Sequence, residues 1–261
     1  MILALTLIAL TGVSFGLVGA GGAILVVPIL VYAFGLSPVE ATGYSFLVVL
    51  VIALGGAIVG MIQKQVAYRI VGVFAPLAMA SAYLSRYYLV PLIPDLRLSP
   101  TLTLPAGTLV MFVFSTVLFL AGASMLRAVK DNKLSPSVPI VAVNAAGVGG
   151  LSGILGVGGG FLIVPVLTKR LGLAMKEAVS TSMTIVSLIS LGGLGGVIAS
   201  KAPLHAAVAV PIVSAAGVGL LAGIAIRGRV AGDKLKKFFG GLALTVGVCV
   251  LAVELFRLAT V

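Results

Sequence analysis

Two glycine-rich stretches decide how this chain folds: GLVGAGGAILVVP at residues 16–28 and GILGVGGGFLIVP at residues 153–165. The second lies 137 positions after the first and aligns with it without a gap. Beyond the quoted letters, the same offset pairs Gly35 with Gly172, Glu40 with Glu177, Ser45 with Ser182 and Gly55 with Gly192. Chance does not keep so many glycines in phase, so the chain consists of two related halves. Each half opens with an apolar segment that glycines interrupt.

The composition predicts a protein that crosses a membrane several times. Of the 261 residues, 61% are hydrophobic and 9% are charged, and the mean hydropathy is +1.29. A soluble core needs far less apolar surface than this. The 34 glycines suit helices that pack closely in lipid.

The net charge of +11 would suggest a nucleic-acid partner if the protein were soluble. Here the basic residues lie mainly between apolar runs, where they orient the chain in the lipid bilayer, so no nucleic-acid partner is predicted. Cys249 and His205 are the single cysteine and the single histidine of the sequence. A single cysteine excludes an internal disulfide, and the lack of further Cys and His argues against a metal site. No cofactor is predicted.

The apolar segment of the first half is too short after its glycines to cross a bilayer again. Residues 23–34 form an apolar run of twelve, which reaches about 18 Å as a helix, against a hydrocarbon core of about 30 Å. Two arrangements fit this length. Either the whole segment is one kinked spanning helix, or it is a re-entrant pair that turns at the glycines and returns to the side from which it entered.

The distribution of positive charge favours one of these arrangements. With spanning glycine segments, the loops divide the 17 lysines and arginines 7 against 10, which is nearly no bias. With re-entrant segments they divide 13 against 4, which follows the positive-inside rule. We therefore predict re-entrant segments and three crossings per half, so that the two halves lie inverted in the membrane. Both chain termini are then periplasmic.

The predicted fold class is all-α and integral to the membrane, with two inverted repeats. Each repeat combines a glycine-broken re-entrant helix pair with three spanning helices, and both repeats form one transport domain. Repeat 1 covers residues 1–134, with the re-entrant segment at 1–35 and spans at about 42–62, 70–90 and 106–125. Repeat 2 covers residues 135–261, with the re-entrant segment at 138–171 and spans at about 178–199, 206–226 and 238–256.

A chain that turns at mid-membrane leaves the first N–H groups of its second arm without partners. Those groups and the positive end of the helix dipole favour an anion, and glycines let it approach the backbone. We predict that one small anionic substrate lies between the two turns and contacts Gly19, Gly21, Gly22, Gly156, Gly158, Gly159 and Gly160. The alternative is that these glycines only allow helices to pack tightly.

Hydroxyl groups one to two turns into the following spans form a second set of candidate substrate-binding groups. They are Tyr44 and Ser45 in the first half, and Thr181 and Ser182 in the second. These groups could donate hydrogen bonds to the anion without adding charge. The alternative is that they bond to the carbonyls of their own helices.

Two equivalent carboxylates, Glu40 and Glu177, lie near predicted helix starts. Ser37, Pro38 and Glu40 fit the N-cap, N1 and N3 positions of a helix. Each glutamate either complements the dipole of its helix or is a protonatable residue that couples transport to protons.

The paired motifs resemble those of the TauE/SafE sulfite exporter family. The resemblance rests on residues 16–28 followed by 41–45, and on 153–165 followed by 178–182, and it covers essentially the whole chain. The usual Thr-Ser pair of the family is present as Thr181-Ser182, whereas the first half has Tyr44-Ser45. The resemblance implies export of sulfite, sulfoacetate or a related small sulfur-containing anion across the bacterial inner membrane.

We therefore expect a transporter rather than an enzyme, and we expect it to export the anion by alternating access. No Asp, His or Cys lies near the glycines in the sequence, so no acid–base or nucleophilic group is evident there. Export of an anion from a cell that is negative inside needs no second driving ion, and proton coupling is the alternative. Uptake of a neutral or cationic solute and a non-transport membrane scaffold are the rival functions.

Overall fold

The computed structural model describes residues 2–18, 22–97, 103–126, 138–169, 171–226 and 232–259. Apart from one short hairpin, these residues form helices joined by short connections. Gly19 and Gly21 lie outside the described residues, and so does the whole segment of residues 127–137 between the two halves.

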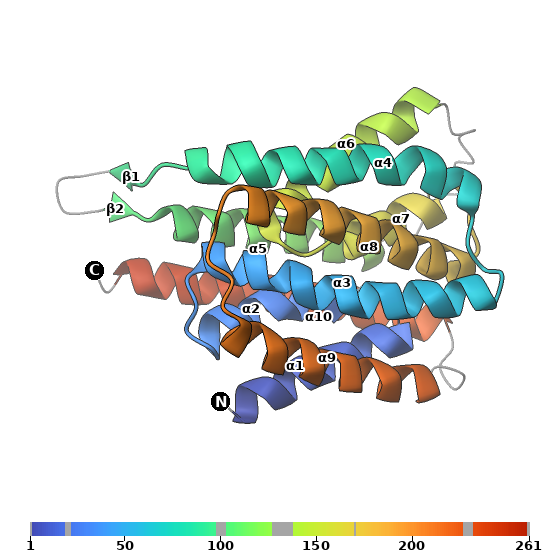
Figure 1. The fold of residues 1–261 in the computed structure, drawn as a ribbon, viewed down its shortest axis with the longest axis horizontal. Coiled ribbons are helices and arrows are strands. Elements are labelled where there is room, and N and C mark those ends of the chain that lie inside the picture. Colours follow the sequence, from blue (N-terminus) through green and yellow to red (C-terminus); the bar gives the residue numbers. More distant parts are fainter. Residues whose placement is uncertain are drawn as a thin grey trace.

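The helices follow the predicted order, as Figure 1 shows. In the first half they are α1 (Ile2–Val18), η1 (Gly22–Leu25), α2 (Val26–Tyr32), α3 (Pro38–Ile62), α4 (Tyr68–Leu84), η2 (Ser85–Leu89), η3 (Val90–Leu92) and α5 (Ala106–Leu126). In the second half they are α6 (Val138–Leu155), α7 (Gly160–Lys169), α8 (Met175–Ala199), α9 (Ala206–Ile226) and α10 (Gly232–Ala259).

Six helices among the described residues are long and apolar enough to cross a membrane, and they include all six predicted spans. The chain is therefore a multi-pass membrane protein. Shorter apolar helices cover Ile2–Gly16, Gly22–Tyr32 and Val141–Leu155, next to the two glycine stretches. The loop predicted between the second and third spans contains the hairpin of β1 (Leu96–Arg97) and β2 (Thr103–Leu104).

The start of α3 has the predicted cap. The Ser37 hydroxyl accepts a hydrogen bond from the Glu40 N–H at 3.4 Å, and the Ser37 N–H donates to Glu40 Oε2 at 3.2 Å. Pro38 occupies the first turn, where a missing N–H costs nothing. This capping box fixes where α3 begins and therefore where its first buried residues lie.

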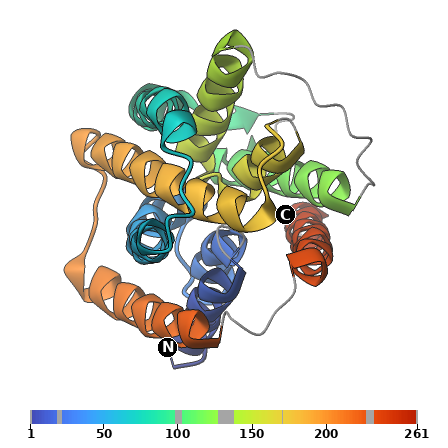
Figure 2. The same cartoon turned by 90° about the vertical axis from the view of Figure 1, so that its right-hand side faces the viewer.

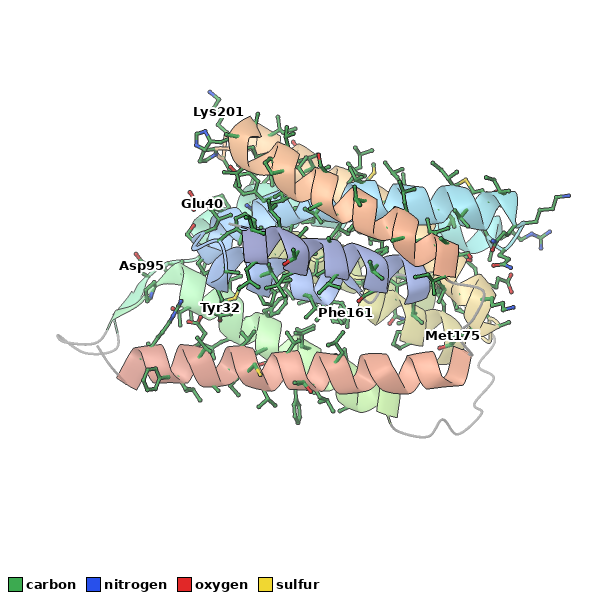
Figure 3. The ribbon with its side chains drawn as sticks, turned by 90° about the horizontal axis from the view of Figure 1, so that it is seen from below. Tyr32, Glu40, Asp95, Phe161, Met175 and Lys201 are labelled. Atoms are coloured by element: carbon green, nitrogen blue, oxygen red, sulfur yellow. The ribbon has the colours of Figure 1, made fainter. Side chains whose placement is uncertain are left out.

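The two ends of the helix bundle differ in what they carry. Figure 1 shows β1–β2, the start of α3 and the end of α10 on one side, which we call the hairpin end. In the same view α1 runs away from the hairpin end and α2 runs back toward it. In the second half, α6 runs inward from the opposite end and α7 runs back to that end. Figure 3 places Tyr32 and Glu40 toward the hairpin end, Met175 at the opposite end and Phe161 between them.

The longest helices pack in pairs around the central pair α3 and α8. α1 packs on α9, α6 packs on α4, and α5 packs on α10; Figure 2, which looks along the bundle, shows these pairs. Glycines make the first two contacts possible, because a Cβ at Gly12 would overlap the Ala216 backbone and one at Gly149 would overlap that of Ala78. Gly12 and Gly149 thus allow the close helix packing that the glycine content of the sequence predicted.

Large apolar side chains cover both the inside and the outside of the bundle. Phe46 and Phe74 are fully buried, whereas Val143, Leu221 and Phe256 are about as exposed as side chains on a helix can be. In water such a surface would be costly. In a bilayer it faces lipid, which agrees with the hydropathy of the sequence.

Candidate functional site

The glycine turn of the second half lies halfway along α3 and α8. Gly156, Gly158 and Gly159 have φ angles of +71°, +65° and +72°, in the left-handed region that favours glycine. A Cβ at Gly158 would lie 2.8 Å from a methyl carbon of Val49 and of Val186, which are central residues of α3 and α8. The positive φ angles and the close neighbouring atoms therefore both disfavour any residue larger than glycine at these positions.

Several backbone N–H groups of this turn have no hydrogen-bond partner. The Gly156 N–H still bonds to the Ser152 carbonyl at 2.8 Å, and the Leu162 and Ile163 N–H groups both bond to the Gly159 carbonyl. The N–H groups of residues 157–161 lie between these bonded groups. Within the described part of the chain, no acceptor receives a hydrogen bond from them. These are the unsatisfied donors expected at the start of α7.

Two serine hydroxyls adjoin the same turn, and they too have no partner among the described residues. Ser152 of α6 and Ser190 of α8 are 2% and 0% exposed, and neither oxygen makes a hydrogen bond. A Cβ at Gly159 would overlap Ser152 Oγ, and one at Gly158 would lie 3.0 Å from Ser190 Oγ. Unpaired donors from three elements thus meet in an apolar interior.

Sequence reasoning missed Ser152 and Ser190. A signal was nevertheless present in the repeat, because the 137-residue offset places Phe15 opposite Ser152 and Ala53 opposite Ser190. A difference between the halves at positions next to the glycines marks places where their chemistry differs.

Ser45 is the one predicted hydroxyl that contacts the turn. Its Oγ donates to the Gly156 carbonyl at 2.6 Å, and both residues are buried. Its equivalent, Ser182, donates to the Val179 carbonyl of its own helix at 2.8 Å, which is the bonding that the alternative expected.

The hydroxyls of Tyr44 and Thr181 bond to other elements and not to the turn. The Tyr44 hydroxyl accepts from the His205 N–H at 2.7 Å, just before α9. The Thr181 hydroxyl accepts from the Ala67 N–H at 2.9 Å, just before α4. These equivalent residues therefore cap equivalent helices of the other half, at opposite ends of the bundle. Their contact with a substrate stays a prediction.

Only part of the first glycine turn can be compared with the second. A Cβ at Gly22 would lie 2.7 Å from the Thr11 carbonyl oxygen and 2.8 Å from the Phe15 nitrogen, so η1 packs tightly on α1. Gly19 and Gly21 lie outside the described residues, and their role in binding stays a prediction.

The predicted coupling carboxylates occupy helix starts. Glu40 belongs to the capping box of α3, and its Oε2 also accepts from the Ser37 hydroxyl at 2.7 Å. Glu177 lies in the first turn of α8, is partly exposed and makes no hydrogen bond or ion pair with the described residues. Their role in proton coupling stays a prediction.

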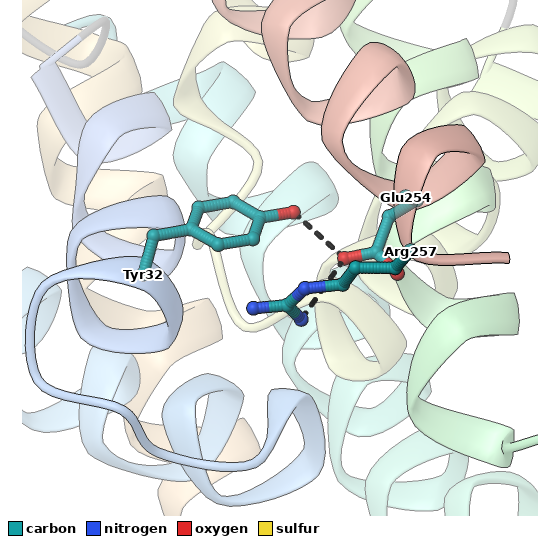
Figure 4. Close-up of polar contacts among 3 residues, drawn as sticks. All are labelled: Tyr32, Glu254 and Arg257. Carbon is teal, nitrogen blue, oxygen red and sulfur yellow. Dashed lines mark hydrogen bonds and ion pairs between the residues drawn. The ribbon is translucent and has the colours of Figure 1, made fainter. Parts of the chain in front are cut away.

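A buried carboxylate that the sequence analysis did not single out is Glu254 of α10. It is 2% exposed, and its Oε1 accepts from the Tyr32 hydroxyl at 2.8 Å and lies 3.6 Å from an Arg257 nitrogen. Figure 4 shows this cluster between α2 and α10. It joins the end of α2 to the last helix. Within the described residues, no group of His, Cys, Asp and Glu side chains could hold a metal ion.

Comparisons with known proteins place the chain among membrane transporters. A probable membrane transporter protein of Haemophilus influenzae is 28% identical over 210 residues, which cover 77% of this chain and 74% of that protein. The probable membrane transporter protein YunE of Bacillus subtilis is 26% identical and covers 70% of this chain and 73% of its own length. No solved structure matches the chain significantly. The profile of the family described as sulfite exporter TauE/SafE matches residues 4–250, so the chain belongs to that family.

Proposed function

We propose that this transporter exports a small sulfur-containing oxyanion, such as sulfite or sulfoacetate, by alternating access, and that the turn before α7 binds it. The observation that carries the proposal is the set of unpaired donors at that turn. It comprises the N–H groups of residues 157–161 and the hydroxyls of Ser152 and Ser190. All of these groups are donors. They therefore favour a ligand that accepts hydrogen bonds and has no donor groups of its own.

The energetics favour an anion over a neutral solute at this place. In an apolar interior, each unsatisfied polar group costs several kcal/mol, so a ligand with several acceptor oxygens offsets that cost. The positive end of the α7 dipole adds attraction for negative charge. Because the described donors of the turn are neutral, the anion is held without a salt bridge, which favours release on the far side.

The arrangement of the helices supports two inverted repeats that alternate in access. The contact of α1 with α9 has its counterpart in the contact of α6 with α4, as expected if one half is turned over relative to the other. With re-entrant segments, positive charges divide 13 against 4 between the two sides. The side with more charge is cytoplasmic by the positive-inside rule. We infer from this rule that the hairpin end and both termini are periplasmic, in a bacterial inner membrane.

The membrane potential is sufficient to drive export. Moving one negative charge out of a cell that is negative inside is favoured by about 2.3 kcal/mol per 100 mV. Proton coupling through Glu177 would add to this force but is not required.

The test is flux in proteoliposomes that contain the purified protein. Labelled sulfite, sulfoacetate and thiosulfate are loaded separately, and efflux is followed with an imposed potential of either sign. We expect faster efflux when the exit side is positive, and anion-dependent thermal stabilisation of the detergent-solubilised protein. Flux of neutral or cationic solutes instead, or of none of the anions, would contradict the proposal.

A double variant ties the flux to the turn. Ser152→Ala with Ser190→Ala removes both unpaired hydroxyls and leaves the glycines in place. We expect its thermal stability without anion to be unchanged or higher, because an unsatisfied buried group is costly. The stabilisation by anion should shrink, and anion efflux should fall with it.

A further inference from the structure

Arg86 is a buried cation without a buried counter-charge. It lies in η2, a π-helical stretch that continues α4 toward the hairpin end, and it is 2% exposed. Its guanidinium donates to the Thr42 hydroxyl at 2.7 Å and to the Val39 carbonyl at 3.0 Å. Two of its five N–H groups are thus used, and both go to neutral oxygens of α3.

The carboxylates that the structure describes are all engaged elsewhere or remote. Glu40 is closest in the chain to the Arg86 partners, but it bonds to Ser37 and forms no ion pair with Arg86. Asp95 accepts from the Ala106 N–H, and Glu254 pairs with Tyr32 and Arg257. Glu177 begins α8 at the opposite end of the bundle. An ionisable residue within a membrane span usually marks a substrate or ion pathway.

The space for the Arg86 side chain is created by glycines on both central helices. A Cβ at Gly196 of α8 would lie 2.8 Å from Arg86 Cβ, and one at Gly43 of α3 would lie 3.3 Å from an Arg86 Nη atom. The repeat places Gly223 at the position equivalent to Arg86. The cation is therefore a feature of one end of the bundle and not a requirement of the repeated fold.

Arg86 adjoins the α7 turn through a single residue. Thr42, which accepts the hydrogen bond from Arg86, packs directly on Gly156, where a Cβ would lie 2.6 Å from the Thr42 Cα. The positive end of the α3 dipole lies on the same side, because Val39 and Thr42 belong to its first two turns. The Arg86 guanidinium and the positive end of the α3 dipole thus lie together on the hairpin side of the α7 turn.

We propose that Arg86 is the charge-selecting residue of the pathway: it binds the anion between the α7 turn and the hairpin end. This rests on the proposed function, since it assumes that an anion occupies the turn. Three N–H groups of the guanidinium are left for a ligand, and their planar geometry matches two oxygens of an oxyanion. The chemical class is a small oxyanion with at least one full negative charge, and cations are repelled at the same point.

Three variants separate a role of the charge from a role of the bridge to α3. Arg86→Met removes the charge and keeps an apolar side chain. Arg86→Lys keeps the charge, but a lysine cannot reproduce the forked bridge to Thr42 and Val39. Thr42→Val removes one bond of the bridge and leaves the arginine in place. Each is measured in proteoliposomes as kcat/KM for labelled sulfite efflux.

We expect kcat/KM to fall at least tenfold in Arg86→Met. In Arg86→Lys it should be much closer to the wild-type value than in Arg86→Met. In Thr42→Val it should differ from wild type by less than threefold. An equal loss in the lysine and methionine variants would show that the bridge matters and the charge does not, which overturns the proposal. Unchanged flux in Arg86→Met would overturn it as well. If the methionine variant does not fold, Arg86→Lys decides alone: near-normal kcat/KM supports the charge role, and a tenfold loss overturns it.

The same experiment distinguishes this proposal from the proposed function. If the wild-type protein moves no anion, the proposed function fails first. If the wild type moves anions and Arg86→Met moves them equally well, only the role of Arg86 fails. Anion-dependent thermal stabilisation reports binding at the α7 turn separately, and we expect Arg86→Met to keep at least part of it while its flux is lost.

Discussion

The two glycine turns share a sequence pattern but not a lining. In the second half the turn adjoins Ser152 and Ser190, whose hydroxyls have no partner among the described residues. The repeat places Phe15 and Ala53 at these two positions in the first half, and both side chains are fully buried or nearly so. The glycine pattern is thus common to both halves, whereas the two serines belong to the second half alone. Under the proposed function, the anion is therefore held mainly by the second half.

The difference also assigns separate tasks to the halves. In the first half, Gly22 packs tightly on α1 beside Phe15, whose side chain is fully buried. A turn with unpaired donors needs a ligand to become satisfied. Under the proposed function, the second half holds the anion while the first half closes against it, which is what alternating access requires.

Gly158→Ala should have the largest effect on this comparison. The new Cβ would lie 2.8 Å from Val49 and Val186 methyl carbons, at a φ of +65° that L side chains rarely adopt. Misplacing the donors by about 1 Å can cost a hundredfold in rate, so we expect flux below about 1% of wild type. Efflux from proteoliposomes measures it.

Two controls belong with Gly158→Ala. Gly147→Ala adds a methyl group to α6 where nothing lies within 4 Å, so flux should stay normal. Gly22→Ala crowds the first turn and should lower thermal stability, while the folded fraction keeps its affinity for the anion. Equal loss of affinity in the Gly22 and Gly158 variants would mean that both turns bind the anion equally.

Ser190→Ala and Ala53→Ser test the lining directly, because these positions are equivalent in the two halves. A hydrogen bond to a charged group contributes about 1.5–3 kcal/mol. We therefore expect Ser190→Ala to raise the apparent dissociation constant of the anion by roughly 10- to 100-fold. Ala53→Ser should leave it unchanged. Thermal shifts titrated with sulfite give both constants, and a tighter constant in Ala53→Ser would place the anion between the halves.

Ser45→Ala and Ser182→Ala compare the two equivalent serines after the turns. Ser45 bonds to the Gly156 carbonyl across two elements at 2.6 Å, whereas Ser182 bonds within its own helix at 2.8 Å. Loss of the first leaves a buried carbonyl unpaired and should cost about 1–3 kcal/mol of stability. Loss of the second should cost under about 0.5 kcal/mol. Thermal unfolding in detergent measures the difference, and a larger loss in Ser182→Ala would contradict the contact.

Much of the helix layout could be predicted from the sequence, for a definite reason. In a bilayer, hydropathy sets where spans occur, and Ser37, Pro38 and Glu40 set where α3 begins. Six helices of spanning length and hydropathy occur among the described residues at about the predicted positions, and the cap is confirmed. The apolar segments beside the glycines are also shorter than the spans, as their composition indicated.

The lining of the site could not be read in the same way. Ser152 and Ser190 are ordinary small polar residues in apolar helices, and nothing local distinguishes them from serines that bond to their own carbonyls. Only the packing of α6 and α8 around the turn leaves them without partners. Arg86 was counted by sequence as one of the charges that orient the chain, because its burial depends on Gly196 of α8, more than a hundred residues away.

The smallest expected effect concerns the two equivalent glutamates. Glu40→Ala breaks the capping box of α3 and should lower stability by about 0.5–1 kcal/mol. Glu177→Ala removes only an interaction with the helix dipole, since Glu177 makes no hydrogen bond with the described residues, and should cost about 0.3–0.5 kcal/mol. Flux should remain within about fivefold of wild type in Glu40→Ala and within about twofold in Glu177→Ala, because losses of this size, even if carried fully into the barrier, change a rate by no more than that. Proton coupling is tested by measuring the flux of Glu177→Gln and Glu40→Gln from pH 5 to pH 8. If the pH dependence vanishes in Glu177→Gln and persists in Glu40→Gln, Glu177 couples protons to the anion. The two helix starts then differ in function, as the two turns do.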